Sequence, residues 1–137
     1  MKIILSVGAL CLATAAASAQ NVSTQDSLLS ENTVKVSDHV WAIIGWPNIG
    51  IVVGETATLV VDTGLGPRSG ATVAKVAKRL APDNKLYLTT THFHPEHAAG
   101  ASGFPAGTIL IRAKVQQDEM DKHGERMIHL FSSRNDQ

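Results

Sequence analysis

Residues 90–100 read TTHFHPEHAAG and hold three of the six histidines of the chain. This stretch continues a run of strand-forming residues that begins at Lys85. At an extended strand end, residues two apart point to the same side, so His92 and His94 present their rings to one point. Proline keeps the preceding residue extended and suits the first position of a helix, so Pro95 is expected to turn the chain there.

That turn brings Glu96 and His97 back over the point that the two preceding imidazoles face. Zinc prefers nitrogen and carboxylate oxygen ligands, and a catalytic zinc site keeps one position open for a water whose pKa falls to about 7. We interpret the cluster as a metal site because ligand types, spacing, flanking strand and following helix all agree. The other histidines stand alone and are interpreted as surface or core residues: His39, His123 and His129.

The residues before the motif predict an α/β arrangement of strands and one helix. The expected strands are 34–36, 40–44, 49–53, 56–62 and 85–91, with turns at 45–48 and 54–55. Pro67 opens a helix whose apolar residues recur at helical spacing until Pro82 stops it. A strand, a helix and a strand in this order form a right-handed parallel crossover. Asp62 and His92 should therefore meet at one edge, where open α/β sheets place their sites.

From about Val34 to Phe131 the chain resembles the metallo-β-lactamase-fold hydrolases. The resemblance is carried by Asp62-Thr63-Gly64 after the strand meander, by the crossover helix, and by the motif within residues 90–100. It implies an αβ/βα sandwich with one or two zinc ions (Zn²⁺) at the edge of its sheets. The fold class predicted for this chain is thus α/β, a partial sandwich with one mixed sheet and crossover helices.

The same resemblance implies roles for the site residues. His92 and His94 would hold a first ion and Glu96 and His97 a second, each completed by residues from farther along the chain. Asp62 would accept hydrogen bonds that hold the motif loop and so serve the catalytic centre.

Glu96 departs from the family pattern, in which the acidic position of the motif is usually aspartate. The extra methylene moves the carboxylate outward by about 1.5 Å. Because metal–ligand distances hold within about ±0.2 Å, either the backbone compensates or the second ion is displaced or absent. Glu96 is then either a ligand or the catalytic base that takes the proton of the attacking water.

After the motif, only a strand near 108–111 and two helical stretches, 113–122 and 125–132, are expected. The family's later ligands have no obvious counterparts there. Residues 34–137 are therefore interpreted as the N-terminal half of a metallo-β-lactamase-like domain. A sheet without its covering partner exposes apolar surface and unpaired edges, which predicts self-association.

The first 19 residues have the three parts of a signal peptide. Lys2 supplies the positive charge, residues 3–17 form the apolar stretch, and Ala17-Ser18-Ala19 is the cleavage pattern. We therefore expect the mature chain to begin at Gln20 and to be periplasmic or secreted. The apolar stretch is shorter than the ~20 residues of a spanning helix, so no membrane anchor is expected after cleavage. A polar leader, 20–33, is expected to be flexible.

Composition excludes several partners. The formal net charge is zero, which gives no basic surface for nucleic acid. The single cysteine, Cys11, lies in the signal peptide, so the mature chain has no disulfide. The expected partner is a small-molecule substrate.

The sequence favours an exported zinc-dependent hydrolase that attacks an ester, amide or lactam-type bond, the family's common chemistry being attack by a metal-activated hydroxide. Fold alone does not fix the substrate. One alternative is a non-catalytic zinc-binding relative with an incomplete ligand set. A weaker one is a dimeric aspartic protease built on Asp62-Thr63-Gly64, in which two aspartates share a proton. That reading leaves the histidine cluster unexplained, and Leu65 follows where such turns continue with a small residue.

Overall fold

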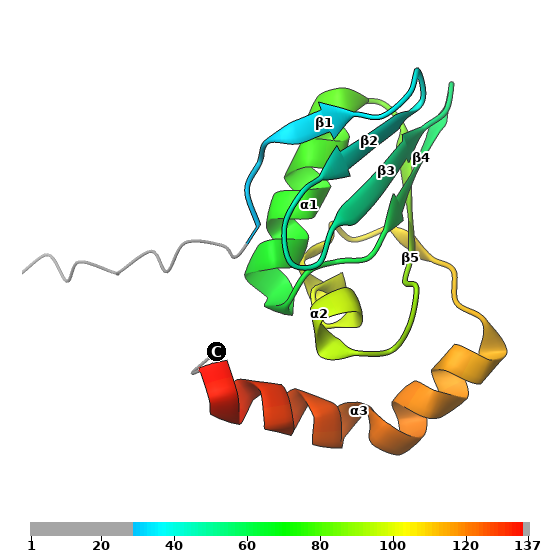
Figure 1. Cartoon of the computed structure of the whole chain (residues 1–137). Coiled ribbons are helices and arrows are strands. Elements are labelled where there is room, and N and C mark those ends of the chain that lie inside the picture. Colours follow the sequence, from blue (N-terminus) through cyan, green and yellow to red (C-terminus); the bar gives the residue numbers. More distant parts are fainter. Residues whose placement is uncertain (1–28, 136–137) are drawn as a thin grey trace, which may run out of the picture.

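The computed structural model describes residues 29–135 and forms one mixed sheet with helices (Figure 1). The strands are β1 (Thr33–Lys35), β2 (Val40–Ile43), β3 (Ile49–Val53), β4 (Ala57–Val61), β5 (Lys85–Thr89) and β6 (Ile109–Leu110). The helices are α1 (Gly66–Leu80), α2 (Pro95–Ala98), the 3-10 turn η1 (Ala101–Gly103) and α3 (Lys114–Asn135). The predicted signal peptide, its cleavage site and the leader before Leu29 lie outside the described residues.

The strand order is β1-β2-β3-β4-β5-β6. The first four strands pair antiparallel, and β5 joins β4 in parallel through α1, as β6 joins β5. This confirms the α/β class and the parallel crossover. It also confirms that the ends of β4 and β5 share one edge, since the backbone N–H of Asp62 donates to the carbonyl of Thr89 at 2.9 Å.

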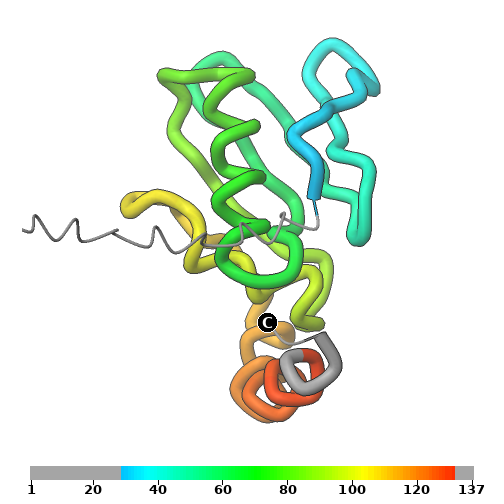
Figure 2. Tube along the Cα trace, turned by 90° about the vertical axis from the view of Figure 1, so that its left-hand side faces the viewer, coloured from blue at the N-terminus to red at the C-terminus, as the bar shows by residue number. Residues whose placement is uncertain are grey.

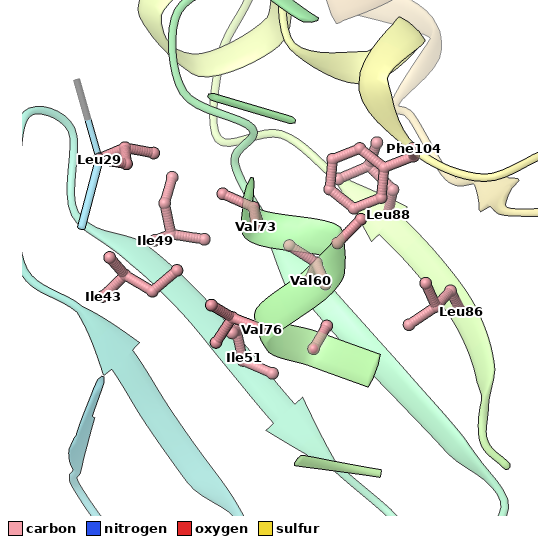
Figure 3. Close-up of a cluster of buried hydrophobic side chains, with 12 residues drawn as sticks. Leu29, Ile43, Ile49, Ile51, Val60, Val73, Val76, Leu86, Leu88 and Phe104 are labelled. Carbon is pink, nitrogen blue, oxygen red and sulfur yellow. The ribbon is translucent and has the colours of Figure 1, made fainter. Parts of the chain in front are cut away.

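The core lies between one face of the sheet and α1 (Figure 3). Every second residue of the strands faces α1, and the apolar residues along one side of α1 pack against them. This agrees with the two-residue repeat of a strand and the 3.6-residue repeat of a helix. The large side chains fully buried in this layer are Ile43, Ile49, Ile51, Val60, Val73 and Val76, each 0% exposed. Burying such a side chain stabilises the fold by roughly 1.5–3 kcal/mol.

Two sequence expectations need correction. Two described residues of the predicted flexible leader, 20–33, are held in place: Leu29 is 3% exposed within the core cluster, and Glu31 pairs with Lys75 and Arg79. The two expected helical stretches after β6 form the single helix α3, which continues through Gly124. A glycine inside a helix costs only about 1 kcal/mol, which flanking helix formers offset. None of the helices in residues 29–135 has the length and apolar character needed to cross a membrane.

The face of the sheet opposite α1 carries two rows of uncharged residues, each row running across neighbouring strands. Strand pairing places Val34, Ala42, Gly50, Val61 and Thr89 in one row, and Val40, Val52, Leu59, Tyr87 and Ile109 in the other. α1 packs on the opposite face, whereas α2 and α3 lie beyond one end of the sheet (Figures 1 and 2). Val52, which has a neighbour on each side in its row, is 37% exposed. An apolar face of this extent favours association.

We therefore expect the purified chain to form dimers or larger oligomers. Val52→Lys should shift it toward monomer, because a charge within this face opposes its burial. Light scattering coupled to size-exclusion chromatography measures this. The matched control is Val115→Lys on α3, since Val115 is 70% exposed but lies off the sheet. A monomeric parent chain, or equal effects of both lysines, would contradict the expectation.

Candidate metal centre

The centre forms where β4 and β5 end and α2 begins. Asp62 follows β4, and Thr91 and His92 follow β5, so the parallel pairing brings these residues to one edge. His94, extended at φ −62° and ψ 146°, precedes the first turn of α2 at Pro95. Pro95 thus keeps His94 extended and starts the helix, as its chemistry requires.

Asp62 is the best-connected side chain of the centre. It is 4% exposed and has a positive φ of 71°, a conformation that aspartate tolerates better than most residues. Its Oδ1 accepts the backbone N–H of Thr91 at 2.7 Å, and the Thr91 hydroxyl lies 3.1 and 3.0 Å from its two oxygens. Its Oδ2 lies 2.9 Å from Nδ1 of His97. Asp62 thereby ties the end of β5 to α2.

The bond to Asp62 defines the tautomer of His97. An ionised carboxylate can only accept, so Nδ1 of His97 carries a proton and donates it to Oδ2. The lone pair then resides on Nε2, on the far side of the ring. A carboxylate behind an imidazole in this way orients the ring and raises its basicity as a ligand.

The structure brings the four predicted ligands together, but not equally. The ring centroid of His92 lies 4.0 Å from that of His97 and 4.7 Å from that of His94. Potential ligand atoms of His92, Glu96 and His97 all lie within 4.8 Å of one another. His94 is outside this set, with its Nδ1 3.7 Å from Oε1 of Glu96. The set thus draws on both of the ligand pairs that the resemblance implied.

Glu96 supplies the clearest sign that the cluster suits a cation. Its side chain is 12% exposed, and its Oε2 is buried with no hydrogen-bond partner among the described residues. A buried carboxylate oxygen without a partner is costly, and native structures rarely leave one unexplained. Two imidazoles and this carboxylate form a donor set that zinc favours. Tetrahedral zinc holds such atoms ~3.4 Å apart, so side-chain shifts of about 1 Å close the set.

The electrostatics keep His92 ready to act as a ligand. Burial lowers the pKa of His92, and the charges of His97 and His94 lower it further, against smaller opposing effects of Asp62 and Glu96. A lowered pKa favours the neutral imidazole, which is the form that binds a metal.

Some contacts at the centre were not anticipated from the sequence. The Thr91 hydroxyl, beside the expected ligands, contacts Asp62, and Thr63 bonds to α2. From α3, Gln116 donates to the hydroxyl of Thr90, and the ring of His123 lies 6.3 Å from that of Phe93. The flanking threonines were visible in the sequence, but only the tertiary fold shows what they contact.

A cavity of about 350 Å³ lies beside α2. It is lined by Leu65, Gly66, Pro67, Arg68, Pro95, Ala99, Ile128 and Phe131. None of the four candidate ligands contributes to it. Pro95 and Ala99 are one turn apart and so share one side of the helix. The cavity and the metal cluster are therefore two distinct sites.

Comparison with known families agrees with this geometry. Residues 45–135 match the model of the metallo-beta-lactamase superfamily, and the chain belongs to this superfamily. The match includes Asp62 and the whole histidine motif. No curated protein sequence matches the chain significantly.

Solved structures of metallo-β-lactamases share the fold. The mono-zinc form of FIM-1 from Pseudomonas aeruginosa is 16% identical, with a TM-score of 0.60 over 72% of this chain and 48% of that chain. The enzyme from Erythrobacter litoralis is 15% identical, with a TM-score of 0.61 over 73% of this chain and 48% of that chain. The enzyme from Hirschia baltica is 18% identical, with a TM-score of 0.58 over 68% of this chain and 48% of that chain. The chain thus spans about half the length of these structures.

Proposed function

We propose that this chain supplies metal-holding residues of an exported zinc-dependent hydrolase that cleaves an ester, amide or lactam-type bond in a small molecule. The observation that carries the proposal is the set formed by His92, Glu96 and His97, with the buried Oε2 of Glu96 left without a partner. Membership of the metallo-beta-lactamase superfamily and the zinc in the related FIM-1 structure support the choice of ion and reaction class.

The residues of the chain have separate tasks in this proposal. When bound, zinc supplies a Lewis acid and lowers the pKa of the water it holds to about 7. His92 and His97 would bind the ion as neutral imidazoles, and Glu96 would bind it through its carboxylate. Asp62 would keep the proton of His97 on Nδ1, so that Nε2 stays available. His94, beside Oε1 of Glu96, is placed to bind a second ion or to orient that carboxylate.

The aspartic-protease alternative is not favoured by the geometry. The carboxylate of Asp62 is buried and engaged by Thr91 and His97. It is therefore not free to share a proton with the aspartate of a second chain, as that mechanism requires. The Asp62-Thr63-Gly64 turn instead belongs to the metal centre.

Turnover tests the proposal and separates it from a non-catalytic zinc-binding relative. The longest protein that carries this sequence is loaded with zinc and assayed with a chromogenic β-lactam and an activated ester. We expect hydrolysis that falls to the uncatalysed rate in the double variant His92→Ala, His94→Ala. The control is His39→Ala, since the ring of His39 contacts the carbonyl of Val53 at the end of β3 away from Asp62. Zinc binding without turnover above the double variant would support the non-catalytic relative instead.

A further inference from the structure

Thr63 connects two parts of the metal centre. It follows Asp62, is 0% exposed, and lies in the turn between β4 and α1. Its backbone N–H donates to the carbonyl of His97 at 3.0 Å. Its hydroxyl accepts the backbone N–H of Gly100 at 2.9 Å, and lies 3.0 Å from the His97 carbonyl and 2.9 Å from that of Gly64. One threonine therefore holds both α2, through the carbonyl of His97, and Gly100, which lies two residues beyond the end of the helix.

The segment that follows α2 packs tightly against the surrounding backbone. A Cβ added at Gly100 would lie 2.6 Å from the carbonyl oxygen of Thr63, and one added at Gly70 would lie 1.8 Å from the carbonyl oxygen of Gly100. One added at Gly103 would lie 2.0 Å from the carbonyl oxygen of Pro67. The segment after α2 is thus packed backbone to backbone against Thr63 and α1. Where backbones are packed this closely, water cannot replace a lost hydrogen bond unless the segment moves.

The contact between Thr63 and the segment around α2 determines where Glu96 and His97 lie. α2 is a single turn, Pro95–Ala98, too short to be stable by itself. Asp62 holds only the ring of His97, whereas Thr63 holds its backbone. Among the described residues, the carboxylate of Glu96 has only the 3.7 Å approach of its Oε1 to Nδ1 of His94, so its position follows from that of the helix backbone.

We propose that Thr63 is a positioning residue of the metal centre, whose hydroxyl fixes α2 so that Glu96 and His97 face His92. The expected effect of Thr63 on zinc affinity rests on the proposed metal-binding function. The effect of Thr63 on the position of α2 can be measured in the metal-free protein. Thr63 contacts no candidate ligand atom, so it acts through backbone groups alone.

The test compares Thr63→Val, which keeps the shape and removes the hydroxyl, with Thr63→Ser, which keeps the hydroxyl. The matched control is Thr58→Val. Thr58 is also 0% exposed and bonds through its hydroxyl, to Asn84, but near the other end of β4. Zinc affinity is measured by competition with a chromophoric chelator. We expect Thr63→Val to lose ~10-fold or more, as loss of supporting contacts behind ligands does, and the other two variants to stay within about twofold.

Amide hydrogen exchange in the metal-free protein provides the second readout. The Gly100 amide should be protected in the parent chain and exchange at least ~10-fold faster in Thr63→Val, but not in Thr58→Val or Thr63→Ser. Rapid exchange of Gly100 in the parent would overturn the proposal without any variant, even if Thr63→Val fails to fold. Parent-like zinc affinity in Thr63→Val would also overturn it. If the parent binds no zinc, the proposed function fails, whereas the exchange rates still decide the positioning role.

Discussion

Replacing Asp62 with alanine is expected to weaken both the fold and the metal centre more than any other single change at the site. The substitution leaves the backbone N–H and hydroxyl of Thr91, and Nδ1–H of His97, without their acceptor. An unsatisfied buried donor costs ~1–3 kcal/mol, and alanine at a positive φ adds ~1–2 kcal/mol. Since water can satisfy some of these donors, we expect the free energy of unfolding to fall by about 3 kcal/mol. Denaturant unfolding of the metal-free chain measures this.

Zinc affinity should fall in the same variant by ~10–100-fold, because the ring of His97 loses the carboxylate that orients it. Asp62→Asn is the matched control. Asparagine tolerates the positive φ and keeps an oxygen for Thr91, but its NH₂ group would face Nδ1 of His97 and place the ring proton on Nε2. Most of the stability should therefore return while zinc affinity stays low. Parent-like zinc affinity in Asp62→Asn would show that the tautomer of His97 does not matter.

Replacing Glu96 with glutamine is expected to separate metal binding from stability. The amide keeps the size of the side chain but loses the negative charge that would bind the ion, so zinc affinity should fall by more than ~100-fold, beyond the effect of losing a supporting contact. The free energy of unfolding should change by less than about 1 kcal/mol, because Oε2 has no hydrogen-bond partner to lose among the described residues. Zinc titration and denaturant unfolding of the same samples give both values.

Glu96→Asp restores the aspartate that is usual at this position in the family and tests whether the longer side chain is needed here. The shorter carboxylate withdraws by about 1.5 Å from His92 and His97, so zinc affinity should fall here as well. Parent-like zinc affinity in Glu96→Asp would mean that Glu96 is not a ligand in this position, and a rise would mean that the aspartate usual in the family suits the ion better than Glu96. A large loss of stability in Glu96→Gln would show that the carboxylate has a structural partner after all.

Much of the fold was predictable because the patterns are local. The boundaries of β3 at Ile49 and Val53 follow from the turns on either side, and Pro67 and Pro82 bracket α1 closely. The parallel crossover followed from element order, and it placed Asp62 beside the histidine motif. The packing of Leu29 could not be predicted, because it depends on a core that forms only in the tertiary structure.

The site was predictable in its residue types but not in its grouping. Spacing alone indicated that His92, His94, Glu96 and His97 would gather, since strand and helix periodicity fix which side each faces. The distances between their atoms depend on how α2 is docked, and that docking is set by Thr63 and Gly100. Neither residue carries a metal-binding signal in the sequence, so only the structure reveals their contribution.

Zinc titration of the metal-free chain by calorimetry tests the central claim, that His92, Glu96 and His97 form one metal site. The account predicts saturable binding of zinc to the parent, loss of this binding in His92→Ala and in His97→Ala, and its retention in His39→Ala. His39 is an exposed histidine beside the carbonyl of Val53, at the end of β3 away from Asp62, and controls for nonspecific imidazole binding. The absence of saturable zinc binding by the folded parent, or equal affinities in all three variants, would contradict the claim.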